Sequence, residues 1–179
     1  VKTIGEKAFS ECDIQTLIVP NSVTSLGNNA FSSNTNLKSV VFGKNLAKIG
    51  SNAFSGCISI TKSLRIPGSV ETIGEAAFQG CQYITYLKLG KSVKTIGKNA
   101  FSGCSNIEEI SGFPDTITSI GESSFEGCST MKGILTIPSS IETIGPKAFK
   151  NCYELTGNLT FPSTITIIGE ETFYHCNNL

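Results

Sequence analysis

The stretch IGKNAFSGC, residues Ile96–Cys104, recurs seven more times along the chain with small changes. The other copies read IGEKAFSEC, LGNNAFSSN, IGSNAFSGC, IGEAAFQGC, IGESSFEGC, IGPKAFKNC and IGEETFYHC. Their glycines follow one another at intervals of 22 to 24 residues, so the 179-residue sequence is an array of about eight short repeats. A fixed period of this length is typical of a solenoid, in which each repeat forms one coil.

Two side chains mark every repeat. A phenylalanine stands four residues after the glycine, and this slot holds eight of the eleven phenylalanines. Three residues later comes a cysteine, except that Asn34 takes its place once, so all seven cysteines occupy one slot. Their spacing follows the repeat and not the close pairs of a zinc site. We therefore predict free, buried thiols that fill the interior, with no metal and no disulfide.

The remainder of each repeat predicts a strand and a turn. An alternating run such as YLKLG, residues 86–90, indicates a half-buried strand. The IGxxAF stretch predicts a single helical turn with its Ala and Phe facing inward, and its glycine is expected to supply a backbone angle that a β-carbon would forbid. One repeat has too few apolar side chains to offset the entropy of ordering it, so the copies must stack.

This pattern resembles a known family. A period of 22 to 24 residues with an LxxLxL run is similar to leucine-rich repeats. The specific form, C-x-x-L-x-x-L-x-L-P-x-S-V-x-x-I-G-x-x-A-F, resembles the BspA-like (Treponema-type) class over nearly the whole chain. Where the general pattern has Asn or Cys after LxL, this chain mostly has Ser or Thr, whose hydroxyl groups can satisfy the backbone of a turn.

Together the residues and the resemblance predict an α/β repeat. We expect one right-handed leucine-rich-repeat solenoid over residues 1–179, with a parallel β-sheet on the concave side and short helical turns on the convex side. The resemblance also implies a cell-surface or secreted protein of bacteria or mucosal parasites, with relatives that adhere to host matrix proteins and other cells. Because neither end carries a recognisable cap, we expect a fragment of a longer surface protein.

No residue pattern indicates an enzyme, a cofactor or a metal site. His175 is the only histidine, and the adjacent Cys176 belongs to the inward slot, so the two side chains should point apart. The pairs Glu108–Glu109 and Glu170–Glu171 fit a solvated surface. Lys and Arg total 14, as do Asp and Glu, which gives no reason to expect a nucleic-acid partner. No apolar run approaches the ~20 residues of a membrane span.

The outward positions of the strands are the best candidates for ligand binding, because the sheet of leucine-rich folds lines the concave face. Arg and Tyr are favoured in binding hot spots, and isoleucines beside them would add apolar area. An ordinary β-surface, which favours Thr, Val and Ile, is the alternative interpretation. The candidate residues are Arg65, Tyr86, Lys88, Ile110, Ile134 and Thr136.

Charge is unevenly distributed along the chain. Residues 1–100 hold 11 Lys and Arg against 5 Asp and Glu, whereas residues 101–179 hold 3 against 9. This polarity could orient a partner or attract an anionic glycan to the first half, or it could be simple drift on a solvated surface. Three functions stay open: an adhesin or interaction module for a protein or glycan ligand, including host matrix; a structural spacer of a surface protein; and an intracellular scaffold.

Overall fold

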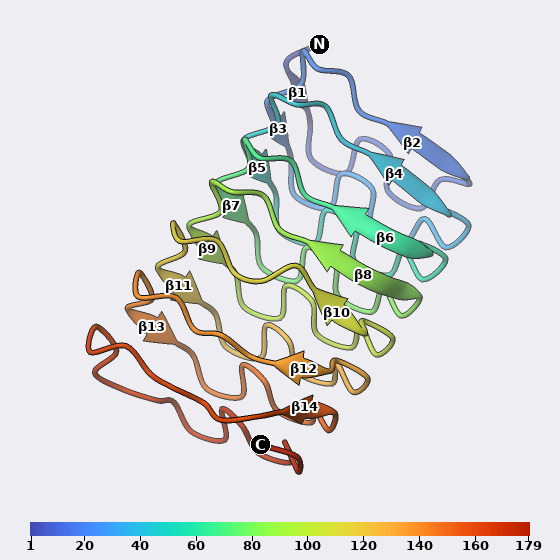
Figure 1. Cartoon of the computed structure of the whole chain (residues 1–179). Coiled ribbons are helices and arrows are strands. Elements are labelled where there is room, and N and C mark those ends of the chain that lie inside the picture. The colour runs from blue at the N-terminus through green and yellow to red at the C-terminus, as the bar shows by residue number, and fades with distance from the viewer.

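The computed structural model of the chain describes residues 1–179 as a stack of similar coils, each carrying two short strands. Figure 1 shows the strands in two rows that run from the N-terminus at one end of the stack to the C-terminus at the other. Odd-numbered strands form one row, here called the back sheet, and even-numbered strands form the other, here called the front face. Every pairing between strands is parallel, as the repeat predicts.

The back sheet is continuous. Each of its strands is the two-residue step before the repeated glycine, and neighbours pair in register, as Thr72 does with Thr95. An isolated bridge from Ile144 to Ile168 continues it into the last coil. Its strands are β1 (Thr3–Ile4), β3 (Ser25–Leu26), β5 (Lys48–Ile49), β7 (Thr72–Ile73), β9 (Thr95–Ile96), β11 (Ser119–Ile120) and β13 (Thr143–Ile144).

The front face carries the alternating runs and is interrupted twice. Its strands pair as β2 with β4, as β6 with β8 and β10, and as β12 with β14. Ladder pairing is therefore absent between β4 and β6 and between β10 and β12. The strands are β2 (Thr16–Ile18), β4 (Ser39–Val41), β6 (Lys62–Arg65), β8 (Ile84–Lys88), β10 (Glu109–Ile110), β12 (Gly133–Ile134) and β14 (Leu155–Thr156).

The expected helical turns are wrong, because the chain contains no helix. In all eight copies the second residue after the repeated glycine has a φ of 50° to 59°, a left-handed value that interrupts a right-handed helix. Successive amide groups instead donate their hydrogen bonds alternately to a carbonyl of the same turn and to a carbonyl of the neighbouring coil. Ala30 donates to Gly27 within its own turn, whereas Asn29 and Phe31 donate to Ser51 and Ala53 of the next coil.

The role expected for the repeated glycine is also wrong. Its φ is not positive in any copy. What excludes a side chain is the previous coil: a β-carbon on Gly97 would lie 2.7 Å from both the Glu75 nitrogen and the Gly74 carbonyl carbon. Gly5 has no preceding coil in the chain and has open space around it. Glycine is therefore needed here for close stacking of backbones.

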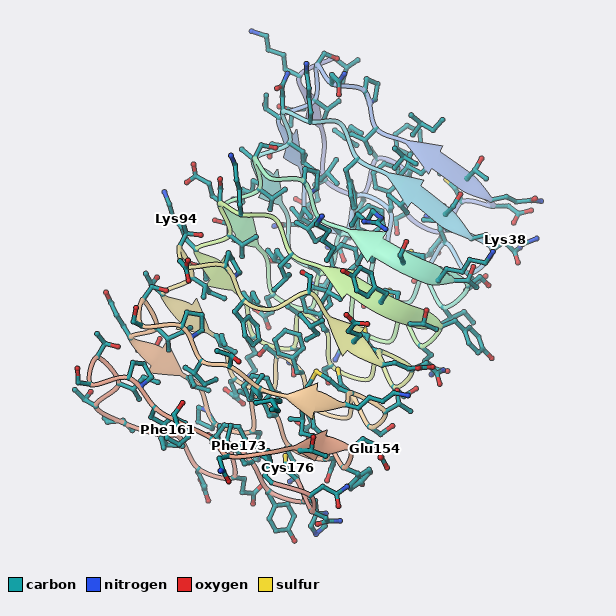
Figure 2. The ribbon with its side chains drawn as sticks, in the orientation of Figure 1. Lys38, Lys94, Glu154, Phe161, Phe173 and Cys176 are labelled. Atoms are coloured by element: carbon teal, nitrogen blue, oxygen red, sulfur yellow. The ribbon has the colours of Figure 1, made fainter.

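The interior is a single hydrophobic cluster built around a column of phenylalanine rings. Neighbouring rings of the repeated slot stack nearly parallel with centroids 5.2–5.5 Å apart, from Phe9 to Phe173. The other three phenylalanines share one slot on the inner side of the front runs and contact this column at an angle. Phe42 meets Phe54 edge-on, and Phe161, labelled in Figure 2, is tilted against Phe173.

The cysteine slot forms a second column. As predicted, all seven thiols are free and six of them are buried. The prediction of burial is wrong for Cys12, which lies in the first coil and is exposed. Each buried thiol donates to the phenylalanine carbonyl of the preceding coil, as Cys104 Sγ does to Phe78 O over 3.1 Å. Asn34 reproduces this contact, because its Nδ2 donates to Phe9 O over 2.7 Å. The hydroxyl slot is satisfied as expected, with Ser140 Oγ bonded to Ile117 O at 2.6 Å.

The front runs differ in length from coil to coil. Cys57 and Pro67 are ten positions apart, whereas Cys81 and Gly90 are nine apart. The additional residue in the first of these coils is Lys62, which has a φ of 66° and shifts the register against β8. Such insertions are β-bulges, which bend a strand and disrupt its ladder. The coils of β10, β12 and β14 also have ten positions, from Cys104 to Pro114, from Cys128 to Pro138 and from Cys152 to Pro162, so the length of the run alone does not determine where the ladder is interrupted.

Candidate functional site

The front face presents two rows of outward side chains across its strands. One row aligns Ser63 with Tyr86 and Glu109, and the other aligns Arg65 with Lys88. Arg65 and Lys88 are exposed and Tyr86 is half-buried, whereas Leu64 and Leu87 between them are buried. The predicted alternation of these strands is therefore confirmed, and Arg65, Tyr86 and Lys88 do come together.

Two other candidates lie apart from this group. Ile134 is 71% exposed on β12, and Thr136 is exposed just beyond it, as expected. The gap between β10 and β12 separates them from Arg65 and Lys88. They form a separate apolar position on the front face.

Ile110 does not point outward as expected. It pairs with Leu87, is half-buried and packs against the core. The reason is the extra residue of this coil, Gly112, which has a φ of 91° and lies after the strand. Because the extra residue comes after Ile110, the inward and outward positions up to Ile110 follow the count from Cys104. The outward residue beside Tyr86 is therefore Glu109.

Arg65 and Lys88 are directly opposite each other in the parallel register of β6 and β8. Like charges in this position destabilise a sheet, so the arrangement has a folding cost. The Arg65 guanidinium lies over an aromatic ring, with its central carbon 5.8 Å from the centroid of Tyr86. A cation–π contact of this kind also fixes the direction of the guanidinium.

A groove occupies the gap between β4 and β6. It has a volume of about 960 Å³ and is lined by both strands and by the turns that follow them. Its charged lining residues are all basic: Lys44, Lys62, Arg65, Lys88 and Lys91. A second hollow of about 620 Å³ adjoins it over β8 and the segment that follows β10, and it shares Lys88 and Lys91. The basic groove, defined by these five residues, is the most distinctive feature of the surface.

The basic groove has an open floor at Gly68. Lys44, Gly68 and Lys91 occupy the same slot in three successive coils, one residue after the Pro or Gly that ends each front run. A β-carbon on Gly68 would lie 3.6 Å from Cγ of Lys91, so the Lys91 stem leans over the glycine. Two ammonium groups therefore flank a position without a side chain.

The five basic groups have no acidic partner in the chain. Its four ion pairs join Lys94 to Glu71, Lys98 to Glu122, Lys132 to Glu108 and Lys150 to Glu171. Figure 2 shows Lys94 projecting on the side of the back sheet, away from the front face. Five lysines outside the groove, Lys2, Lys7, Lys38, Lys48 and Lys147, also form no ion pair. The groove differs because it gathers five unpaired cations around one hollow, where together they can attract an external anion.

Sequence reasoning missed three members of this groove, Lys44, Lys62 and Lys91. Lys44 and Lys91 lie just after the strand runs and not at the outward strand positions. Lys62 is the inserted residue. The distance from the cysteine slot to the closing Pro or Gly varies between eight and ten positions along the chain, and this shows only that the front runs differ in length.

No convergent chemical site lies outside the groove. The thiol of Cys176 points inward to Phe149 O, whereas the ring of His175 stacks on Tyr174 with centroids 4.0 Å apart. Burial raises the pKa of Cys57 to about 11 and that of Cys104 to about 12, so these thiols stay protonated and unreactive. No cluster of three or more His, Cys, Asp or Glu residues could hold a metal ion. The structure has no helix suited to crossing a membrane.

Comparison with known proteins agrees with this architecture. The BspA type leucine rich repeat region, described as six copies, matches residues 2–132 and 59–179. The chain belongs to this family. Repeats of this kind are generally non-enzymatic modules for protein interaction. No curated protein matches the chain significantly.

Solved bacterial structures share the fold. A leucine-rich repeat protein from Eubacterium ventriosum is 24% identical with a TM-score of 0.77, covering 93% of this chain and 44% of that one. The T. pallidum leucine-rich repeat protein is 23% identical with a TM-score of 0.64, covering 100% and 72%. A leucine-rich cell surface protein from Faecalibacterium prausnitzii is 26% identical with a TM-score of 0.57, covering 100% and 68%. The chain spans less than half of the Eubacterium protein.

Proposed function

We propose that this BspA-type chain is a non-enzymatic binding module of a cell-surface or secreted protein and that it holds its ligand on the front face. The observation that carries the proposal is the pairing of Arg65 with Lys88 beside Tyr86. Two like charges placed directly opposite weaken the sheet, and neither forms an ion pair with an acidic group of the chain. A ligand that neutralises both would account for an arrangement that folding alone disfavours.

The biological role we propose is adhesion to host matrix proteins, other cells or glycans. The family membership and the description of the Faecalibacterium neighbour as a cell surface protein support a surface location. We also propose that residues 1–179 form one solenoid within a longer protein. A structural spacer or an intracellular scaffold is the alternative, in which the front face would bind nothing.

The test is binding of the purified chain to an array of host matrix proteins and glycans. The variant Arg65→Ala/Tyr86→Ala/Lys88→Ala removes the three outward side chains that come together on β6 and β8 of the front face. A matched variant, Lys48→Ala/Lys94→Ala/Tyr153→Ala, removes two positive charges on the side of the back sheet and one exposed tyrosine outside the front strands. Both should keep the far-ultraviolet spectrum of the parent, because all six side chains lie at or near the surface.

Saturable binding that the first variant loses and the matched variant keeps would support the proposal. Binding that both variants keep would place the site elsewhere and contradict the front-face assignment. Absence of binding to every component of the array would favour the spacer or the scaffold.

A further inference from the structure

We infer that the basic groove between β4 and β6 binds a sulfated polysaccharide, which lies across the coils of the solenoid. This inference rests on the proposed function, since it names the chemical class of ligand for the same face. It adds residues that the strand pattern alone does not reveal, Lys44, Lys62 and Lys91.

The charge of the groove is local and uncompensated. In the slot of Lys44 and Lys91, the later coils have Asp115, Ser139 and Ser163. The cations are therefore confined to the coils of β4, β6 and β8 and are not a general property of the repeat. All four ion pairs of the chain lie outside this set. Five positive charges around one hollow of about 960 Å³ create a potential that selects for a polyanion.

The coils of β4 and β6 are hydrogen-bonded to each other at both ends of the gap, and this limits how a ligand can bind there. Before β6, the amide of Thr61 donates to Lys38 O at 3.2 Å, and after it, Ser69 Oγ donates to Leu46 O at 2.6 Å. The back strands β5 and β7 also stay paired. An extended peptide therefore has no space to insert as an added strand between β4 and β6. The ligand must rest on the side chains.

The lining suits a sugar chain more than an acidic peptide. Ser39, Thr61 and Ser63 contribute exposed hydroxyl groups beside the cations, and the position of Gly68 carries no side chain that would obstruct a sugar ring. Of the apolar lining residues, Ile60, Leu64 and Ile66 are buried, Val40 and Phe42 are half-buried, and Val41 is 58% exposed, so the groove also offers apolar surface. A sulfated sugar chain can use both kinds of surface, because its rings have apolar C–H faces and its sulfates are anionic. Polar hydroxyl groups and charged groups on an open surface match a sulfated glycan.

The adjoining hollow extends the site along the solenoid. It shares Lys88 and Lys91 with the basic groove and adds Tyr86, Ser111 and Gly112. From β4 to β10 the combined surface crosses four coils, or about 14 Å at the spacing of neighbouring strands. A linear polymer can thus contact cations of successive coils, including the Arg65 guanidinium that lies over the ring of Tyr86.

The experiment measures binding of the whole chain to immobilised heparin as a function of salt. The test variant is Lys44→Gln/Lys88→Gln/Lys91→Gln. Its control, Lys2→Gln/Lys48→Gln/Lys94→Gln, removes the same net charge in or beside the back sheet. We expect saturable binding that weakens with salt, a loss of about tenfold or more in affinity for the test variant and less than about twofold for the control.

Three results would overturn the inference. One is an equal loss in both variants, which would indicate attraction by diffuse charge. Another is tighter binding of polyglutamate than of heparin, which would indicate an acidic peptide ligand. The last is no binding of heparin while matrix proteins still bind the front face. That last outcome would leave the proposed function standing, so the two failures are distinguishable.

Discussion

The thiol of Cys57 donates a hydrogen bond to the carbonyl oxygen of Phe31, 3.1 Å away in the preceding coil. Five later cysteines repeat this contact with the phenylalanine one coil back. The cysteine column is therefore a set of links between coils that also satisfies carbonyl groups in a dry interior. Asn34 fits the column because its amide is an equivalent donor.

Stability should fall at alkaline pH because of these thiols. Burial raises the pKa of Cys104 to about 12, against about 8.5 in an unfolded chain. Since the folded pKa is the higher one, the stabilisation is complete below about pH 8.5 and is lost as the pH rises towards 12. Urea unfolding from pH 7.5 to 10.5 should therefore show a declining free energy of unfolding, by up to about 1.4 kcal/mol per pH unit for each such thiol.

Cys104→Ala is the matched variant for this measurement. It should be less stable at pH 7.5 by about 1–2 kcal/mol, because Phe78 O loses its donor. Its decline with pH should be shallower than that of the parent by the contribution of one thiol. Identical slopes in parent and variant would contradict the assignment of the decline to the cysteine column.

The phenylalanine column predicts a strong dependence on position. Phe101 is fully buried between Phe78 and Phe125, whereas Phe9 at the end of the column is 44% exposed. Phe101→Ala should cost about 3–5 kcal/mol, and Phe9→Ala less than half as much. Urea unfolding monitored by circular dichroism would measure both. If the two costs were equal, ring burial could not be what stabilises the stack.

The repeated glycine predicts a contrast between two identical substitutions. At Gly97 an added β-carbon meets the backbone of the preceding coil at 2.7 Å, whereas at Gly5 nothing lies within 4 Å. Gly97→Ala should destabilise the chain by about 1–3 kcal/mol or more, since backbone must move. Gly5→Ala should change stability by no more than about 0.5 kcal/mol. A tolerated Gly97→Ala, measured by thermal unfolding, would argue against close stacking as the reason for this glycine.

One buried hydroxyl group offers a stabilising substitution. Ser124 occupies a slot that holds alanine in six of the eight repeats, and its Oγ is buried without a hydrogen-bond partner. Ser124→Ala should raise the free energy of unfolding by about 1 kcal/mol. Thr172, in the same slot, donates to Gly169 O at 2.8 Å, so Thr172→Val should lower it by about 1 kcal/mol. Opposite signs in chemical denaturation are the expected result.

The repeat period determined what could be predicted from the sequence. It placed Phe101 and Cys104 in the interior and Arg65 and Lys88 outside, because a fixed spacing along the chain becomes a fixed position in each coil. The left-handed turn residues were not predictable in this way. Asn29, Ala76 and other unlike residues adopt the same conformation, so residue type alone carries no clear signal for it.

Inserted residues limited how well the outward side chains of the front face could be predicted from the sequence. Lys62 and Gly112 each add one residue to a coil, and each changes the phase of the side chains near it. A shift of one residue exchanges inward and outward faces of a strand, which is why Glu109 and not Ile110 lies beside Tyr86. The groove between β4 and β6 lies where the front ladder is interrupted, and the run lengths in the sequence do not indicate that position.

The most direct test of ligand binding on the front face is lysine footprinting. The chain would be acetylated briefly with and without heparin, and each lysine would be quantified by mass spectrometry. Our account predicts that heparin slows the modification of Lys44, Lys62, Lys88 and Lys91 severalfold and leaves Lys2, Lys7 and Lys48 unchanged. Uniform protection, or protection confined to lysines of the back sheet, would contradict it.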